Sequence, residues 1–303
     1  MPDSPAAPAP SPQELDRLVD AALDEDARPS AGWPAGTRHG DVTSEHALPA
    51  GVAARARLVA KAHGRLAGLD VFARVFERCD PAARVERRAS DGDALEPGQV
   101  VAEVRGEARA LLRAERTALN FVQHLSGVAT LTARYVAAAG GRARILDTRK
   151  TTPGLRALEK AAVRAGGGEN HRFGLFDEAM LKNNHVDLAG RPLADLVRDL
   201  RAALGPRTRI TAEARDEAEA LSAVAGGADV VLLDNLSTER MAALCPRLRA
   251  AAGGRPLELE ASGGVTLETV AAIAATGVDR VSVGALTHSV RALDLSLYVE
   301  RAP

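Results

Sequence analysis

Residues 209–234, RITAEARDEAEALSAVAGGADVVLLD, decide the fold. The segment predicts a strand over residues 209–213, a helix that ends at a Gly-Gly pair, and a second strand over residues 229–234. Outward from it, the same pattern predicts four further strands, over residues 143–147, 178–182, 257–262 and 279–284. Strands that alternate with helices indicate a parallel sheet with right-handed crossovers, and six such strands could close into a β/α barrel.

The first half of the chain has a different pattern. A helical apolar spacing covers residues 13–30, and short alternating pieces separated by Asp-Gly and Pro-Gly turns follow from Val52. A long helix is predicted over residues 114–139, where Ser126 and Gly127 could interrupt it. We therefore expect a small, mainly antiparallel unit before the β/α region.

Composition excludes several classes of protein. Lys and Arg total 39 and Asp and Glu total 40, so a formal net charge of −1 gives no overall field that would attract nucleic acid or a membrane surface. No apolar stretch approaches the roughly 20 residues of a membrane span, and the N-terminus lacks the basic flank and apolar run of a signal peptide. We expect a cytoplasmic protein in which residues 1–12 form a disordered tail.

Polar or small residues stand at the carboxyl end of every predicted strand of the β/α region. They are Asp147 with Arg149 and Lys150, then Lys182, Glu213, Asp234, Ser262 with Gly263, and Gly284. One such residue often marks only the end of a strand. Their presence at all the strand ends indicates an active site, because β/α barrels assemble their catalytic residues at this face.

The stretch from Asp147 to His185, DTRKTTPGLRALEKAAVRAGGGENHRFGLFDEAMLKNNH, supplies most of the cations of this site. They cluster at three points, TRK, NHR and LK, next to the ends of apolar runs. The Gly triplet before His171 and Arg172 cannot belong to a helix interior and places both residues in a loop. Acidic residues are also present, so the signal is the clustering and not the net charge. A substrate with several negative charges is the expected ligand.

Two carboxylates, Glu213 and Asp234, end neighbouring predicted strands and favour Mg²⁺, which prefers oxygen ligands and bridges to substrate phosphates. The alternative is a structural ion network in which they pair with the lysines of the cationic stretch. The SGG sequence at 262–264 and SVGAL at 282–286 are typical of a phosphate site, where small residues let backbone N–H groups approach an anion. We expect a helix beginning near Thr266 to point its N-terminus at that anion.

Long motifs of the chain resemble the quinolinate phosphoribosyltransferase family, also called carboxylating nicotinate-nucleotide pyrophosphorylases. The stretch from Asp147 to His185 resembles the family signature. The similarity continues in GDVTSEHALP (40–49), ERTALNFVQHLSGVAT (115–130), VVLLDN (230–235), LEASGGV (259–265) and VSVGALTHSVRALDLSL (281–297). Nearly the whole chain is covered, in the right order.

The resemblance implies an N-terminal α/β sandwich over residues 13–125 and a C-terminal incomplete β/α barrel, of the type II phosphoribosyltransferase kind, over residues 126–287. Residues 288–303 would return to the first domain. A homodimer or higher oligomer is also implied, in which each subunit covers its partner's barrel. The implied reaction joins quinolinate to 5-phosphoribosyl 1-diphosphate in the presence of Mg²⁺. Its products are nicotinate mononucleotide, pyrophosphate and CO₂, a step of NAD biosynthesis.

The resemblance also assigns roles to individual residues by motif. On the quinolinate side it places Arg149, His171, Arg172, Lys182 and, from the partner subunit, Arg116. On the phosphoribosyl diphosphate side it places Lys150, Glu213, Asp234, Ser262, Gly263 and Gly284. The catalytic residues would be Lys150, Lys182, Glu213 and Asp234, with both acids holding Mg²⁺ directly or through water. Cations suit a dicarboxylate because Arg binds a carboxylate bidentately.

Departures from the family pattern leave other functions open. Asn183, Ala162 and Thr211 stand where Asp, Tyr and an acidic residue are common. One alternative is a paralogue associated with molybdenum transport that uses a different acceptor. Another is a Schiff-base aldolase with Lys182 as the nucleophile, and a third is a non-catalytic phosphometabolite-binding protein. Turnover of quinolinate that depends on phosphoribosyl diphosphate and Mg²⁺ would separate the main hypothesis from all three.

Overall fold

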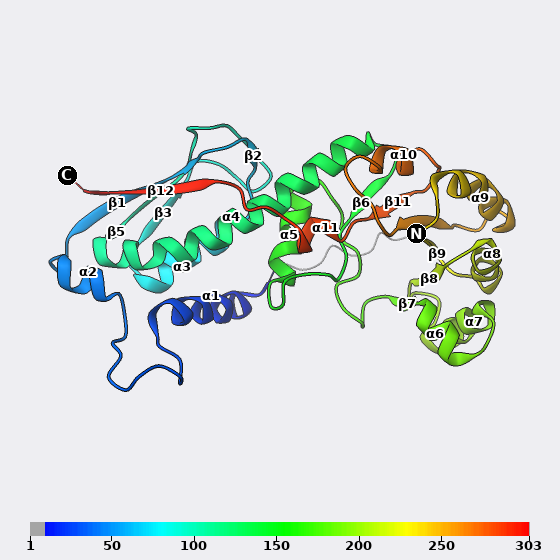
Figure 1. Ribbon diagram of the computed structural model, residues 1–303, viewed down its shortest axis with the longest axis horizontal. Coiled ribbons are helices and arrows are strands. Elements are labelled where there is room, and N and C mark those ends of the chain that lie inside the picture. Colours follow the sequence, from blue (N-terminus) through cyan, green and yellow to red (C-terminus); the bar gives the residue numbers. More distant parts are fainter. Residues whose placement is uncertain (1–9, 303) are drawn as a thin grey trace. The chain divides into compact units, whose positions relative to one another are not determined.

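Two units make up the chain in the structure, a computed structural model that describes residues 10–302. The barrel unit consists of residues 132–151 and 167–289 (Figure 1). The sandwich unit consists of the described residues before 132 together with residues 152–166 and 290–302. Residues 152–166 belong to the sandwich unit, although the chain on either side of them belongs to the barrel unit.

A parallel sheet of six strands forms the centre of the barrel unit, in the order β6-β11-β10-β9-β8-β7. The strands are β6 (Arg144–Leu146), β7 (Ala179–Leu181), β8 (Ile210–Ala214), β9 (Val230–Asp234), β10 (Glu258–Ser262) and β11 (Arg280–Ser282). All six strands predicted from the sequence are present. Most residues of β8, β9, β10 and β11 are buried, as in a sheet covered on both faces.

Helices connect these strands on the outside of the sheet (Figure 1). They are α6 (Asn183–Ala189), α7 (Leu193–Leu204), α8 (Glu217–Gly226), α9 (Thr238–Ala251), α10 (Val270–Ala274) and α11 (Ala285–His288). Helices α7, α8 and α9 lie side by side, and α8 packs on β8 and β9. The crossover from β8 to β9 ends as its sequence predicts, because Gly227 adopts φ 90° at the C-cap of α8.

The barrel is open between β6 and β7, which share no ladder in the described sheet. The chain from Gly167 to Glu178 lies along this opening. Glu169 forms an isolated bridge with Leu146 of β6: its N–H donates to the oxygen of Ile145 at 2.8 Å, and its oxygen accepts the N–H of Asp147 at 3.2 Å. The incomplete barrel implied by the resemblance is therefore observed, and residues 167–178 of the cationic stretch connect its two edges.

The sandwich unit contains a mainly antiparallel sheet in the order β12-β1-β5-β3 and a separate pair, β2 with β4. The strands are β1 (Ala53–Ala60), β2 (Gly64–Arg65), β3 (Arg84–Arg87), β4 (Ala94–Leu95), β5 (Val100–Glu107) and β12 (Leu295–Arg301). Strand β12, near the C-terminus, pairs with β1 over seven residues, with Leu58 opposite Leu297. The end of the chain thus completes the edge of the N-terminal sheet.

The helices of the sandwich unit are α1 (Pro12–Ala27), α2 (Val42–Ala47), α3 (Leu69–Cys79), α5 (Arg156–Ala165) and most of α4 (Ala108–Ala139). Helix α3 was not predicted, although Leu69, Phe72 and Phe76 of its buried face have helical spacing. Helices α3 and α4 cover one face of the sheet, which explains the alternating burial of β1 (Figure 1). No helix in the described part of the chain is long and apolar enough to cross a membrane.

Helix α4 differs from its prediction at two points, its start and its continuity. Helix α4 begins at Ala108, and Gly127 does not interrupt it. The glycine serves close packing, because a Cβ at Gly127 would lie 2.3 Å from the backbone oxygen of Arg291. Residues 1–9 of the predicted tail lie outside the described residues, but Ser11 already caps α1, where its hydroxyl and backbone N–H bind Glu14 reciprocally.

Candidate active site

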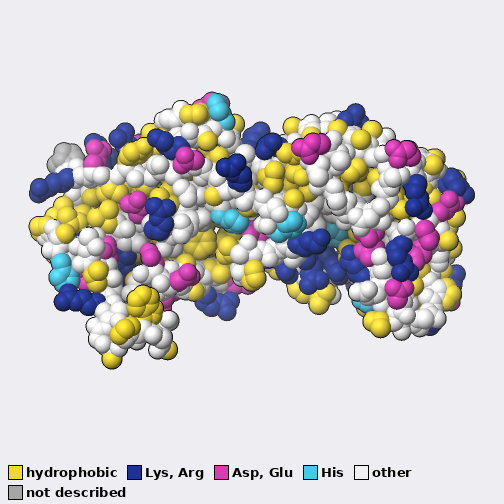
Figure 2. Space-filling model, in the orientation of Figure 1, with side chains coloured by type: hydrophobic (Ala, Val, Ile, Leu, Met, Phe, Trp, Pro, Cys, Tyr) yellow, Lys and Arg dark blue, Asp and Glu magenta, His cyan; other side chains and the backbone are white. Residues whose placement is uncertain are grey.

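A cavity of about 180 Å³ lies at the carboxyl ends of the barrel strands. Six residues predicted to contact substrate line it: Arg149, Lys150, His171, Arg172, Lys182 and Ser262. The other predicted residues of this unit, Glu213, Asp234, Gly263 and Gly284, end or follow the same strands outside the cavity lining. Figure 2 shows Lys and Arg side chains gathered on the face of this unit near β7.

The cations of the cavity lie close enough to affect one another. Burial and the positive charge of Arg149 lower the pKa of Arg172 below its usual value. The Arg172 guanidinium donates through Nη1 to the backbone oxygen of Glu178 at 3.2 Å, which directs the side chain across the opening between β6 and β7. Such a surplus of positive potential in a partly buried cavity favours a bound anion.

Asp147 holds the loop that carries these cations. Its fully buried carboxylate accepts a hydrogen bond from Asn170 Nδ2 at 2.6 Å and one from the backbone N–H of His171 at 2.8 Å. The acid that follows β6 therefore fixes the start of the second cationic cluster. Its role is to place the cations, and it explains why acidic residues occur within the cationic stretch.

Lys182 and Glu213 form an ion pair at the ends of β7 and β8. The ammonium of Lys182 donates to Glu213 Oε2, and the backbone N–H of Asn183 donates to Oε1 at 3.3 Å. Glu213 is nearly buried, whereas the Lys182 side chain is 43% exposed and can reach a ligand. For this pair, the structural ion network considered from the sequence is present.

Glu213 and Asp234 lie on the same face of neighbouring strands. The ladder pairs Glu213 with Leu232, and Asp234 follows two residues later on β9, so both side chains project to the same side. Two carboxylates offer the oxygen donors that Mg²⁺ prefers. Among residues 10–302 no group of three or more His, Cys, Asp or Glu side chains could hold a metal. The residues fit an ion that takes most of its ligands from substrate and water.

The loop after β10 requires glycine at residue 263. Gly263 adopts φ 95°, and a Cβ there would lie 2.2 Å from Asn235 Oδ1. Asn235, which itself has φ 53°, donates its backbone N–H to the oxygen of Ser262 at 2.9 Å. The close approach of the β9 and β10 loops therefore leaves no room for a side chain and exposes backbone to a ligand.

The second glycine loop lies against a cation. A Cβ at Gly284 would lie 3.1 Å from Cδ of Lys150, so the absence of a side chain makes room for the lysine. The predicted helix near Thr266 is wrong, because α10 begins at Val270 and has five residues. Thr266 instead donates its N–H to the Thr269 hydroxyl at 2.9 Å, which keeps this segment in a turn. The Gly263 loop therefore offers loop backbone to a phosphate, whereas Gly284 is the N-cap of the four-residue helix α11.

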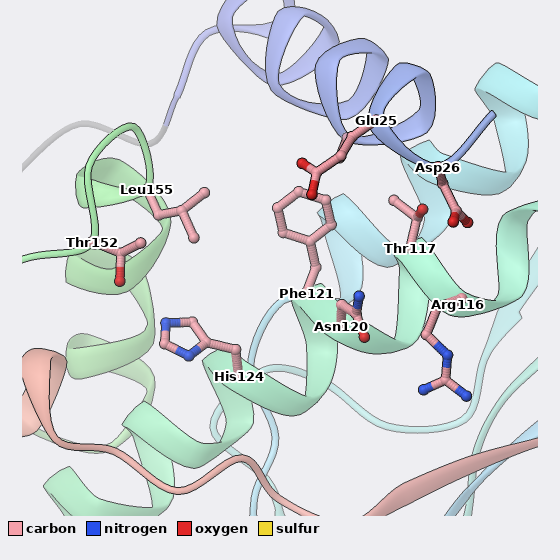
Figure 3. Close-up of a pocket in the computed structure, with 10 residues that line it drawn as sticks. Glu25, Asp26, Arg116, Thr117, Asn120, Phe121, His124, Thr152 and Leu155 are labelled. Carbon is pink, nitrogen blue, oxygen red and sulfur yellow. The ribbon is translucent and has the colours of Figure 1, made fainter. Parts of the chain in front are cut away.

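Arg116 belongs to the sandwich unit and lines a different cavity, of about 480 Å³ (Figure 3). Arg116, Asn120 and His124 follow one another at four-residue intervals on α4 and lie along one side of it (Figure 3). His124 Nε2 lies 2.7 Å from the buried carboxylate of Glu159. This cavity is larger, but it mixes one Arg with acidic and apolar side chains. The polyanion chemistry is concentrated in the barrel cavity.

Two family models match the chain in succession. The N-terminal domain of quinolinate phosphoribosyl transferase matches residues 41–126, and the C-terminal domain of the same enzyme matches residues 128–298. The chain belongs to the quinolinate phosphoribosyl transferase family. The second model covers all six strands that carry the barrel cavity.

Relatives of the family resemble the chain over most of its length. The probable nicotinate-nucleotide pyrophosphorylase (carboxylating) of Bacillus subtilis is 42% identical over 86% of this chain and 88% of the relative. The enzyme of that name from Mycobacterium leprae is 45% identical over 85% and 90%. The crystal structure of NadC from Streptococcus pyogenes, 38% identical, superposes with a TM-score of 0.87 over 98% of this chain and all of that one.

In this member of the family, sequence reasoning missed two charged residues inside the barrel, Glu260 and Arg280. Glu260 lines the cavity and is fully buried, and Arg280 is 3% exposed. A signal was present in the run LELEAS, where the period of two residues places Glu258 and Glu260 on the same face as Ser262. An acid on the inward face of a buried strand has to be paired, and its partner stands on the next strand.

Proposed function

We propose that the protein transfers the phosphoribosyl group of 5-phosphoribosyl 1-diphosphate to quinolinate and releases pyrophosphate and CO₂, forming nicotinate mononucleotide. The observation that supports this most directly is the meeting of Arg149, Lys150, Arg172 and Lys182 around one cavity of the barrel. Both substrates are polyanions, so each needs several cationic donors. The names of the relatives and the family models point to the same reaction.

Quinolinate would occupy the part of the cavity between β6 and β7. Arg149, Arg172 and Lys182 supply donors for its two ring carboxylates, and the planar guanidinium groups can bind them bidentately. His171 lies on the same side. The raised positive potential at Arg172 favours a dianion there over a neutral pyridine.

The phosphoribosyl diphosphate would bind at the carboxyl ends of the other strands, β8 to β11. Ser262, Gly263 and Gly284 offer backbone N–H groups and space for the 5-phosphate, and Lys150 lies against the second loop. Glu213 and Asp234 would hold Mg²⁺ with the diphosphate and the ribose hydroxyls. When bound, the ion would neutralise charge on the diphosphate leaving group.

The chemistry asks the protein for position and charge. The bond from the anomeric carbon to the diphosphate oxygen breaks, and the pyridine nitrogen forms the new bond to that carbon through a cationic, oxocarbenium-like state. Lys150 and Lys182 would balance the anions on either side, and no covalent nucleophile is needed. The positive ring nitrogen then accepts the electron pair released as the 2-carboxylate leaves as CO₂, and the ring carbon takes up a proton.

We also propose that the protein is a cytoplasmic homodimer, or a higher oligomer, in which Arg116 of one subunit completes the quinolinate site of its partner. Arg116 lines a cavity of the sandwich unit and does not line the barrel cavity. Three polar residues at four-residue spacing would present one continuous face of α4 to the partner.

The Schiff-base alternative loses support from the Lys182 ion pair. An amine that donates to a carboxylate is in the ammonium form, which has no lone pair with which to attack a carbonyl. In the alternative paralogue, a different acceptor would bind beside Arg149 and Arg172. It would use the same phosphoribosyl donor, so the acceptor decides between the two functions.

The test is a turnover assay with the purified protein. Quinolinate should disappear, and pyrophosphate and CO₂ should form in equal amounts, only when phosphoribosyl diphosphate and Mg²⁺ are both present. Nicotinate, which lacks the 2-carboxylate, is the matched control acceptor and should react much more slowly. No release of pyrophosphate with quinolinate would overturn the proposal, and release with another acceptor alone would favour the paralogue.

A further inference from the structure

A buried ion pair lies inside the barrel beneath the cavity. The ladder places Glu260 of β10 opposite Arg280 of β11, and Glu260 Oε2 lies 2.8 Å from Arg280 Nε. The interiors of β/α barrels are usually filled by branched apolar side chains, so a fully buried carboxylate here is unusual. Although burial opposes ionisation, the charge of Arg280 and hydrogen bonds from His171 and Ser282 lower the pKa of Glu260, and the group is a carboxylate.

His171 connects this carboxylate to the loop of the cavity. Its Nε2 lies 3.3 Å from Glu260 Oε1, and its Nδ1 accepts the backbone N–H of Arg172 at 2.7 Å. A ring nitrogen that accepts an N–H carries a lone pair and no proton. The ring proton therefore belongs on Nε2, where it faces Glu260, and the imidazole is neutral.

The contacts form one chain from the sheet to the anion site. Arg280 balances Glu260, Glu260 orients His171, and His171 holds the backbone of Arg172. The Arg172 guanidinium is fixed at its other end by the oxygen of Glu178. Because the Glu260 charge is balanced by Arg280, it does not cancel the positive potential that attracts an anion to Arg149 and Arg172.

We propose that Glu260 is a positioning residue for the acceptor site: it holds His171 in the Nε2–H tautomer and thereby sets the place of Arg172. His171 then acts by placing Arg172, since Nδ1 accepts the Arg172 N–H and Nε2 lies 3.3 Å from the Glu260 carboxylate. The kinetic part of this inference rests on the proposed transferase function, whereas the tautomer does not. The proposal concerns the acceptor alone, because no residue assigned to the phosphoribosyl donor belongs to this chain of contacts.

The tautomer is tested without turnover, by NMR of the full chain labelled with ¹⁵N in histidine. The chain has seven histidines, so the spectrum of His171→Gln assigns the signals of His171 by difference. We expect a proton on Nε2 and none on Nδ1. A proton on Nδ1 would overturn the proposal even if the enzyme is active.

Kinetics of Glu260→Gln and Glu260→Leu test the effect on the acceptor. Gln keeps an oxygen that can accept from Nε2–H, and Leu keeps the volume and removes the acceptor. We expect Leu to raise KM for quinolinate by roughly tenfold or more, with KM for phosphoribosyl diphosphate within about twofold, and Gln to restore most of the loss. If Glu260 acted only through its charge, both variants would lower KM for the dianion. Equal changes for both substrates would indicate a structural role and overturn the proposal.

Circular dichroism and thermal unfolding check that each variant is folded before its kinetics are read. If Glu260→Leu does not fold, Glu260→Gln is measured by kinetics and by NMR. A Glu260→Gln enzyme in which His171 loses its proton from Nε2 but keeps its affinity for the acceptor would contradict the proposal. Should wild type lack activity with quinolinate, the proposed function fails while the tautomer result stands by itself.

Discussion

Asp147, Glu213 and Glu260 are carboxylates that lie beside the cations of the barrel cavity. Each has a specific partner: Asp147 binds the His171 N–H, Glu213 binds Lys182, and Glu260 contacts Arg280 and His171. Because each acid is engaged by its own partner, the positive charges of Arg149 and Arg172 are not cancelled in the cavity. At the scale of residues, the site is a set of cations held in place by acids that lie behind them.

Replacing Lys182 by Ala should lower kcat/KM for quinolinate by roughly a hundredfold or more, since the ammonium is expected to stabilise charge close to the reacting atoms. Steady-state kinetics measure the loss, and the circular dichroism spectrum should stay unchanged because the side chain is 43% exposed. Arg191→Ala, which removes an exposed cation paired with Asp199, is the control and should keep full activity. An active Lys182→Ala enzyme would remove this residue from the catalytic set.

Gly263→Ala should impair binding of the phosphoribosyl donor. The new methyl group would overlap Asn235 and φ 95° would be strained for Ala, so the loop has to move. We expect KM for phosphoribosyl diphosphate to rise with little change in KM for quinolinate, as measured by varying each substrate in turn. Gly254→Ala is matched in its positive φ, with open space around it, and lies between α9 and the amino end of β10. A rise in both KM values would point to general loss of structure.

At the scale of elements, the strands were predictable and several helix limits were not. The six barrel strands are short apolar runs that end in polar residues, and that pattern is local in sequence. Helix α3 was missed because turn signals surround it, and the start of α4 was missed because it directly continues β5. Gly127 lies within α4 because only a glycine leaves room for the backbone of Arg291, which is far away in sequence.

The same limit applies to the site. Residues at strand ends could be predicted, because the carboxyl ends of parallel strands meet at one edge of the sheet. The contact between Glu260 and Arg280 depends on the register of β10 with β11, which local patterns do not specify. Asp147 as the acceptor of the His171 N–H depends on how the loop crosses the opening, and only the folded chain defines that path.

Gly127→Ala tests the close packing of α4. An added methyl group would collide with the Arg291 backbone, so the chain leading to β12 must shift. We expect the free energy of unfolding to fall by about 1–3 kcal/mol, a typical cost of overpacking, as measured by urea unfolding. Gly32→Ala is the control, because no atom lies within 4 Å of its Cβ position, and it should change stability by less than about 0.5 kcal/mol. Equal stability of the two variants would contradict the packing argument.

Low pH should destabilise the barrel unit, because the carboxylate of Glu258 becomes protonated. Although burial raises it, the pKa of Glu258 is lowered overall by Arg209, Arg280 and Arg144. A carboxyl with a pKa below its unfolded value of about 4.3 stabilises the fold above that pH, and the contribution is lost as pH falls through the folded value. Urea unfolding between about pH 5 and 3 should show a shallower pH dependence for Glu258→Gln than for wild type. Glu217→Gln, an exposed carboxyl of α8, should keep the wild-type slope.

At the scale of the whole molecule, the proposed dimer predicts complementation between two inactive variants. Arg116→Ala and Lys182→Ala each remove a residue from the same proposed site, but from different subunits. Mixing and reassociating the two should regenerate intact sites in mixed dimers, to about one quarter of wild-type activity for random exchange. Activity is measured before and after the exchange. If Arg116 served its own subunit's barrel, mixed dimers would contain no intact site and the mixture would stay inactive.

The residues expected to bind the two ligands are held in place in different ways on either side of the opening between β6 and β7. The residues expected to bind the phosphoribosyl donor end or follow strands β8, β9, β10, β11 and β6, which are joined by a continuous ladder. Two of those expected to bind the acceptor, His171 and Arg172, lie on a segment that crosses the break and is held by side-chain contacts and one isolated bridge. Sequence changes in that crossing segment need not disturb the ladder. A barrel of this design can therefore exchange its acceptor specificity in evolution while it keeps its donor.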